Sequence, residues 1–203
     1  MTDVPDKPAR VANEKAILEA TLEALEKVGE AKLRVMDIAR AVGCSVGLLY
    51  HHYGNREGLI EAARVQQFLG LLDQDIVAIE AAVDACQDVE EFRRLVRQLA
   101  TIGAGPEREE RRAQRIAVLG ACVKRPGLRV AVGRVQSEWT TRLQTALERA
   151  QAKGLIHPRV NARALAAFTQ AYTLGRILSD IDPVPIPDED WSELSLAFLL
   201  QLT

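Results

Sequence analysis

The sequence predicts an all-α fold, and three observations support this prediction. The residues that dominate the 203 positions are Ala, Leu, Arg, Glu and Gln, all of which favour helices. Apolar residues recur three and four positions apart, which is the period of an amphipathic helix. No stretch alternates apolar and polar residues as a strand does, and the sequence has no hairpin signal or internal repeat. We expect an N-terminal three-helix domain over 11–71 and a larger helical domain over 72–203.

Charge and cysteine content limit the class of protein. The formal net charge is -2, which argues against a polybasic nucleic-acid coat. The three cysteines are far apart, with no CxxC pair and no Cys-His spacing that suits zinc. The N-terminus lacks the apolar core of a signal peptide, and no apolar run approaches the length of a bilayer span. We therefore expect a cytoplasmic protein that carries no metal or other cofactor.

Residues 1–28 are expected to form an arm and a first helix. Met1 to Arg10 is polar, contains two prolines and is predicted to be a disordered arm. Lys7 and Arg10 could reach a partner from this arm, although a merely solvated tail is an equal alternative. A helix is predicted over 11–28, with its apolar positions at helical spacing, and Gly29 ends it.

Residues 34–53 predict two short helices joined by a tight bend. The first has apolar positions at Val35, Ile38, Ala39 and Val42 and ends at Gly43. Ser45 suits the N-cap of the second, because its hydroxyl can accept backbone N–H groups of the next turn. Leu49 and Tyr53 give this second helix one inward face. A link of about three residues is the length of a helix-turn-helix bend.

These residues resemble the DNA-binding motif of the tetracycline-repressor (TetR) family of bacterial regulators. The positions that match are Asp37-Ile38-Ala39, Gly43, Ser45, Leu49-Tyr50, His52-Tyr53, Asn55-Arg56-Glu57 and Leu59. The resemblance implies a sequence-specific DNA-binding transcription regulator, a repressor that a small molecule releases from its operator. It also implies dimerisation through the last two helices and hence a near-palindromic operator.

The predicted DNA contacts come partly from this resemblance and partly from the place of each residue on the second helix or the arm. The predicted set is Ser45, Val46, Gly47, Leu48, Tyr50, His51 and Arg56, together with Lys7 and Arg10 of the arm. Tyr50 and Arg56 match positions that contact the DNA backbone. Arg34 stands where the family usually has Thr or Ser, so the first helix should lack a side-chain cap. Val46 and Leu48 offer only methyl groups, so we expect contact with thymine methyls, unless Leu48 packs inward.

The middle of the chain predicts further helices and a candidate ligand cavity. A helix opening at Asn55 is expected to run to about Ala85, in one or two pieces, and further helices cover 89–102, 108–124 and 128–153. The expected ligand is a small apolar or aromatic molecule. Apolar residues at this spacing are more often ordinary core than cavity wall. The candidate lining residues are Phe68, Leu72, Phe92, Leu95, Ile116, Leu119, Cys122, Trp139 and Leu143.

Two final helices are predicted over 161–179 and 188–202, separated by a proline-rich linker. Their apolar stripes suit pairing with a second copy of the chain in a four-helix bundle, or packing within one chain. The candidate interface residues are Leu165, Phe168, Tyr172, Trp191, Leu194 and Phe198.

Other function classes are weaker. The sequence has no Gly-rich phosphate loop, GxSxG or paired-carboxylate motif, and adjacent His51 and His52 point about 100° apart on a helix, so an enzyme is not expected. A dimeric helical protein-interaction module without DNA would leave the tyrosine and histidine pattern unexplained. Cys44, beside a helix start, could sense redox state or simply pack as a small hydrophobe. The expected partners are therefore double-stranded operator DNA, a small-molecule inducer and a second copy of the chain.

Overall fold

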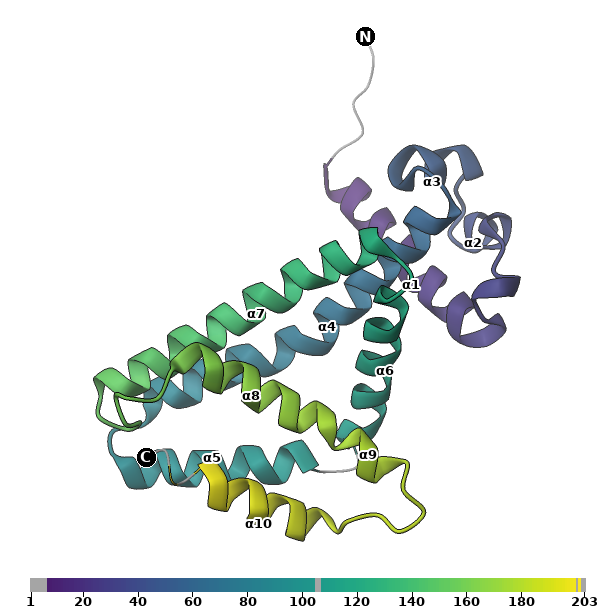
Figure 1. Cartoon of the computed structure of the whole chain (residues 1–203). Helices are drawn as coiled ribbons and strands as arrows, with labels where there is room; N and C mark the ends of the chain where they lie inside the picture. Colours follow the sequence, from purple (N-terminus) through teal and green to yellow (C-terminus); the bar gives the residue numbers. More distant parts are fainter. Residues whose placement is uncertain (1–6, 105–106, 200, 202–203) are drawn as a thin grey trace.

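The computed structural model describes residues 7–104, 107–199 and 201, and their side chains except those of 7–13, 73–75, 103–104 and 107 (Figure 1). Over these residues the chain is helical and contains no strand. The helices are α1 (Lys7–Val28), a 3₁₀ turn η1 (Glu30–Lys32), α2 (Val35–Ala41), α3 (Val46–Tyr53), α4 (Arg56–Ala85), α5 (Val89–Ala104), α6 (Glu107–Cys122), α7 (Pro126–Ala152), α8 (Ala162–Gly175), α9 (Ile177–Asp180) and α10 (Asp188–Leu199). None of the described helices is long and apolar enough to cross a membrane.

Helices α1, α2 and α3 and the first turns of α4 form an N-terminal head with its own core. Ile17, Ile38, Leu49 and Ile60, one from each helix, are buried there. Burying side chains of this size is worth about 1.5–3 kcal/mol each, which compensates for the low intrinsic stability of helices as short as α2 and α3.

The first helix begins earlier than the sequence predicts. The backbone of α1 is helical from Lys7, whereas 1–10 was predicted to be a disordered arm. Pro8 is compatible with this start, because proline lacks an N–H that the first helical turn leaves without an intrahelical partner in any case. Residues 1–6, the rest of the predicted arm, lie outside the described residues.

Helix α4 is one uninterrupted helix of 30 residues, not two pieces, and it passes from the head into the second part. It lies along α7, and Figure 1 shows the two running side by side. The indole Nε1 of Trp139 donates to the carbonyl oxygen of Leu72 at 3.0 Å, and Arg142 pairs with Glu80 through two hydrogen bonds. These contacts fix α4 and α7 side by side, so the expected domain boundary at 71/72 falls inside a helix.

Helices α5, α6, α8, α9 and α10 lie below the α4–α7 pair in the view of Figure 1. Helix α8 packs on α7, and α10 packs on α5, where the Ser192 hydroxyl donates to the carbonyl oxygen of Ala100 at 3.4 Å. The predicted helix 161–179 is divided in two, because α8 ends at Gly175 and α9 begins at Ile177. Glycine is among the weakest helix formers, which accounts for a break at this position.

Candidate functional site

Helix α3 is the part of the head with the most exposed functional side chains. Ser45 caps it as predicted, with its hydroxyl oxygen accepting from the backbone N–H of Leu48 at 3.1 Å. Gly43 and Gly54, with φ of 69° and 78°, make the turns on either side that L-residues rarely adopt. Leu49 is fully buried, whereas Tyr50 and His51 are exposed. The helix is thus fixed by its inner face and presents its outer face to solvent.

The apolar residues at the start of α3 do not all face outward. Val46 is partly buried against the head core, so it is less available to a partner than predicted. Leu48 is half-buried but does not belong to that core, and Gly47 is exposed. Gly47 and His51 are four positions apart and therefore occupy one face of the helix. The outer face consists of Gly47, Leu48, Tyr50 and His51.

Tyr53 anchors α3 from the inner side. Its ring packs on the head core, and its hydroxyl is buried without a hydrogen-bond partner among the described residues. Burial raises the pKa of Tyr53 to about 12, with the nearby Glu14 carboxylate adding to the shift. The phenol therefore stays neutral at physiological pH. Cys44 also packs in part against this core, which agrees with its alternative interpretation as a small packed hydrophobe.

Arg56, the predicted phosphate contact, makes three hydrogen bonds within the protein. Its Nε donates to the carbonyl oxygen of Leu33 at 3.2 Å, its Nη2 donates to the carbonyl oxygen of Glu30, and its Nη1 donates to the Glu57 carboxylate at 2.6 Å. These bonds tie the start of α4 to the turn before α2. Because three of its N–H groups already have protein acceptors, we do not include Arg56 among the DNA contacts proposed below.

Arg125, in the turn between α6 and α7, joins the second part of the chain to the head. Its guanidinium donates to the Glu30 carboxylate and, at 3.0 Å, to Glu57 Oε2. Glu30, Arg56, Glu57 and Arg125 together form what we call the hinge cluster. The hydrogen bond from Arg125 lowers the pKa of Glu30 from its usual 4.5, although partial burial opposes the shift, and the same contact raises the pKa of Arg125.

This lowered pKa predicts a pH-dependent contribution to stability. A carboxyl whose pKa is lower in the folded state stabilises the fold above its unfolded pKa and loses that effect as the pH falls through the folded pKa. We expect Glu30→Gln to lower the free energy of unfolding by at most about 1 kcal/mol at pH 7, because the pair is partly exposed. The difference from wild type should vanish as the pH falls below 4.5. Urea unfolding from pH 7 to 3 measures it, with exposed Glu26→Gln as the control; a pH-independent difference would contradict the assignment.

Positive charge around the head is modest. Lys32, Arg34 and Arg40 are exposed on η1 and α2, and Arg40 pairs with Asp37 at 3.3 Å. No side-chain cap from Arg34 reaches α2, as the sequence indicates. Lys7 and Arg10 lie in the first turns of α1, but their side chains are outside the described ones.

The second part of the chain contains a cavity of about 300 Å³. Of the predicted lining residues, Leu72, Phe92, Leu95, Trp139 and Leu143 lie in its wall. The other four do not, because Phe68, Leu119 and Cys122 pack in a separate core between α4, α6 and α7, and Ile116 is exposed. The apolar spacing alone did not reveal which apolar residues of these helices belong to that core and which to the cavity wall.

Sequence reasoning missed the charged part of the cavity wall. Arg108, Arg111, Arg112 and Arg115 of α6 all line it, together with Thr169, Gln170 and Thr173 of α8. The four arginines occur at i, i+3, i+4 and i+7, which places them on one face of α6. That spacing was the available signal, but a basic stripe on a helix usually faces solvent.

The C-terminal helices α8 and α10 expose apolar side chains that meet at Phe168 and Phe198. These side chains, which we call the C-terminal apolar face, are Ala164, Ala167, Phe168, Ala171, Leu194 and Phe198. The rings of Phe168 and Phe198 lie 5.0 Å apart, joining the two helices. The predicted interface residues Leu165 and Tyr172 instead line the cavity, because they face inward one position along from the exposed stripe. Trp191 is half-buried and stacks on Tyr172.

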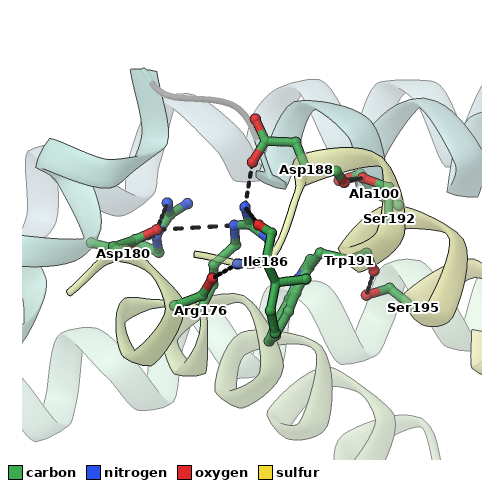
Figure 2. A network of polar contacts seen from close by, with 10 residues as sticks. Ala100, Arg176, Asp180, Ile186, Asp188, Trp191, Ser192 and Ser195 are labelled. Atoms are coloured by element: carbon green, nitrogen blue, oxygen red, sulfur yellow. Dashed lines mark hydrogen bonds and ion pairs between the residues drawn. The ribbon is translucent and has the colours of Figure 1, made fainter. Parts of the chain in front are cut away.

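A buried ionic network connects this region to α6. Arg112 pairs with Asp180 through Nε–Oδ2 and Nη2–Oδ1 contacts of 2.6 and 2.7 Å. Figure 2 shows Arg176 between Asp180 and Asp188, with its guanidinium 5.2 Å from the centre of the Trp191 ring. Arg176 also donates to the carbonyl oxygen of Ile186 at 3.2 Å. The network thus ties the 181–187 segment and α10 to the cavity wall.

Comparison with known proteins identifies the head and the fold. Residues 17–63 match the family model for bacterial regulatory proteins of the tetR family. A curated relative, the HTH-type transcriptional regulator BetI 2 of Chromohalobacter salexigens, is 38% identical over 72 residues, which is 36% of this chain and 33% of the relative. The match therefore spans about a third of that relative's length.

Solved structures resemble the chain over nearly its whole length. A putative TetR-family regulator from Rhodococcus sp. is 25% identical, with a TM-score of 0.66, covering 95% of this chain and 98% of that one. A putative regulator from Saccharomonospora viridis, solved in complex with choline, has a TM-score of 0.63 at 16% identity and covers 93% and 96%, which shows a shared fold only. Residues 17–63 therefore match the tetR family of bacterial regulatory proteins, and the whole chain shares the fold of the Rhodococcus TetR-family regulator.

Proposed function

We propose that the protein is a cytoplasmic, sequence-specific DNA-binding transcription regulator in which residues 11–71 bind DNA. The observation that carries the proposal is the geometry of α3, whose inner face is fixed by Leu49 and Tyr53 and whose outer face is exposed. A helix of this kind fits the major groove. Gly47, Leu48 and His51 would face the bases, with Ser45 at the entrance and Tyr50 donating to a phosphate oxygen.

We further propose that residues 72–203 form the sensing and dimerisation domain. The C-terminal apolar face would bury itself against a second copy, and the two α3 helices would then read half-sites about 34–36 Å apart in a near-palindromic operator. The cavity would hold a small molecule that releases the DNA. Helix α6 supports such coupling, because its arginines line the cavity and Arg125, three residues beyond its end, contacts the head.

Coupling of this kind requires that the ligand bind two conformations with different affinity. The hinge cluster is the contact that a shift of α6 would disturb first, because Glu30 and Glu57 belong to the head and Arg125 does not. Release of DNA would then follow from a change in the relative position of the two α3 helices.

A gel shift with the DNA upstream of the protein's own gene tests the function. Specific retardation that unrelated DNA does not compete away is expected. No retardation of any fragment at low salt would favour the alternative, a helical interaction module that does not bind DNA. Retention of the shift after oxidation would argue against the Cys44 redox alternative.

Base reading by Leu48 gives a sharper prediction. The only methyl group on the base edges of the major groove belongs to thymine. Replacing the contacted thymine by uracil should weaken wild-type binding about fourfold, because one buried methyl is worth about 0.8 kcal/mol. Leu48→Ala should bind both operators equally. Met36→Ala, which trims an exposed apolar side chain on α2, should retain the preference. A scan without any sensitive thymine would leave His51 or DNA shape as the source of specificity.

A further inference from the structure

The cavity wall combines two chemistries on different helices. The apolar part comes mainly from α4, α5 and α7 and includes Leu72, Phe92 and Trp139. The charged part comes from one helix, because all four arginines in the wall belong to α6. A ligand that contacted both parts of the wall would therefore need an apolar body with a polar group at one end.

The described lining residues indicate the sign of the charge on the ligand's polar group. Four of them are arginines and none is an aspartate or glutamate. The other side chains in the wall that carry polar atoms are neutral: Trp139, Thr169, Gln170, Tyr172 and Thr173. Arginine is charged at any physiological pH, and its planar fork of donors matches the geometry of a carboxylate.

The arginines are held in place by contacts within the protein. Arg111 donates to the carbonyl oxygen of Leu71 at 2.7 Å, and Arg112 pairs with Asp180. Arg108 and Arg115 also take part in interactions within the chain. A ligand anion would therefore meet side chains that are already ordered, which reduces the entropy lost on binding.

We propose that the cavity binds an amphipathic anion, a carboxylate joined to an apolar chain or ring. The carboxylate of the ligand would lie against Arg108 and Arg115 of α6, and its apolar part between α4, α5 and α7. This assignment rests on the proposed function, in which the cavity is the effector site, and it replaces the purely apolar ligand that the sequence suggested. A quaternary ammonium such as the choline held by the Saccharomonospora viridis protein would face four guanidinium groups here. A cavity of about 300 Å³ suits a small ligand.

Three probes with the same ten-carbon chain separate the possibilities. Decanoate, 1-decanol and decyltrimethylammonium, each below its aggregation concentration, are titrated into the full-length protein without DNA. Isothermal titration calorimetry measures binding. The fluorescence of Trp139, which lines the cavity, reports occupancy in a Trp191→Phe background that removes the second tryptophan. Decanoate should bind at least tenfold tighter than the other two. Equal or tighter binding of the alcohol or the ammonium compound, or no binding of decanoate, overturns the proposal.

Variants of the arginines test the head-group site. Arg108→Gln/Arg115→Gln should weaken decanoate binding about tenfold and leave decanol binding unchanged. Arg108→Lys/Arg115→Lys keeps both charges and should retain most of the affinity, which shows that the site remains folded. Arg97→Gln, which removes an exposed arginine of α5 outside the cavity wall, is the matched control. Unchanged decanoate affinity in the glutamine variant would overturn the proposal that the ligand's carboxylate binds at α6.

The effector role is measured separately from the ligand class. Decanoate that binds but leaves operator affinity unchanged contradicts the effector role in the proposed function while supporting the anion site. A protein that binds no DNA but prefers decanoate overturns the proposed DNA-binding function and still supports the anion site. Binding of decanol or decyltrimethylammonium in preference, with DNA released, supports the effector role and overturns the anion assignment.

Discussion

Replacing Phe168 and Phe198 together by Glu should convert the protein from dimers into monomers and weaken operator binding at least about 100-fold. The two rings lie 5.0 Å apart and are 44% and 51% exposed in the single chain. Leu194, which is 72% exposed, extends the same face. Exposed apolar patches of this extent mark interaction sites. Two glutamates in the middle would have to lose their hydration for a second copy to pack there.

The effect on DNA is large because the two heads act together. Linking two binding modules raises the overall affinity about 10²–10⁴-fold above that of either module alone, and dissociation of the dimer removes this increase. Sedimentation velocity at micromolar concentration measures the assembly, and fluorescence anisotropy measures operator affinity. Val77→Glu/Val130→Glu adds the same charge at two exposed valines outside the C-terminal apolar face and should stay dimeric. A wild type that sediments as a monomer would rule out this interface.

Asp180→Ala should lower the free energy of unfolding by about 3–5 kcal/mol. The side chains of Arg112 and Asp180 are only 6% and 7% exposed and are joined by two short hydrogen bonds. Nε of Arg176 lies 3.9 Å from the same carboxylate. Removing Asp180 would take the two-bond partner from the buried Arg112 guanidinium and one of two carboxylates from Arg176. Removing one partner of a buried ion pair is strongly destabilising.

Urea unfolding measures this loss of stability. Two further variants show whether the loss comes from the buried ion pair. Asp84→Ala removes a carboxylate that pairs with Arg149 at the surface, and its unfolding midpoint should stay near that of wild type, because surface pairs contribute little. Arg112→Met/Asp180→Leu replaces the pair by apolar residues and should recover part of the lost stability. A loss below about 1 kcal/mol in Asp180→Ala would show that the pair is more hydrated than its burial indicates.

Local features of the head could be predicted because their causes lie within a few residues. Ser45 and Asn55 cap the helices that follow them, with bonds to backbone N–H groups three residues on. Gly29 and Gly43 end the preceding helices at positive φ. Each contact spans less than one helical turn, so the sequence alone contains both partners.

Contacts between distant segments could not be predicted in this way. Arg56 matched a DNA-contacting position, but carbonyl groups of Glu30 and Leu33, more than twenty residues earlier, accept from it. Ile116 has the spacing of a lining residue, yet it is exposed because α6 turns its arginines towards the cavity.

By itself, the sequence determined the all-α class, the helix-turn-helix and the TetR-type motif of the N-terminal head, because helix periodicity, caps and the spacing of the motif are local. Only the tertiary structure decided that α6 brings four arginines to the cavity and that Arg112 meets Asp180, 68 residues later. Periodicity shows which residues share one face of a helix, but it does not show which other helix packs against that face. Which face of α6 is buried depends on the carboxylates and apolar side chains that distant helices place against it, and these come together only on folding.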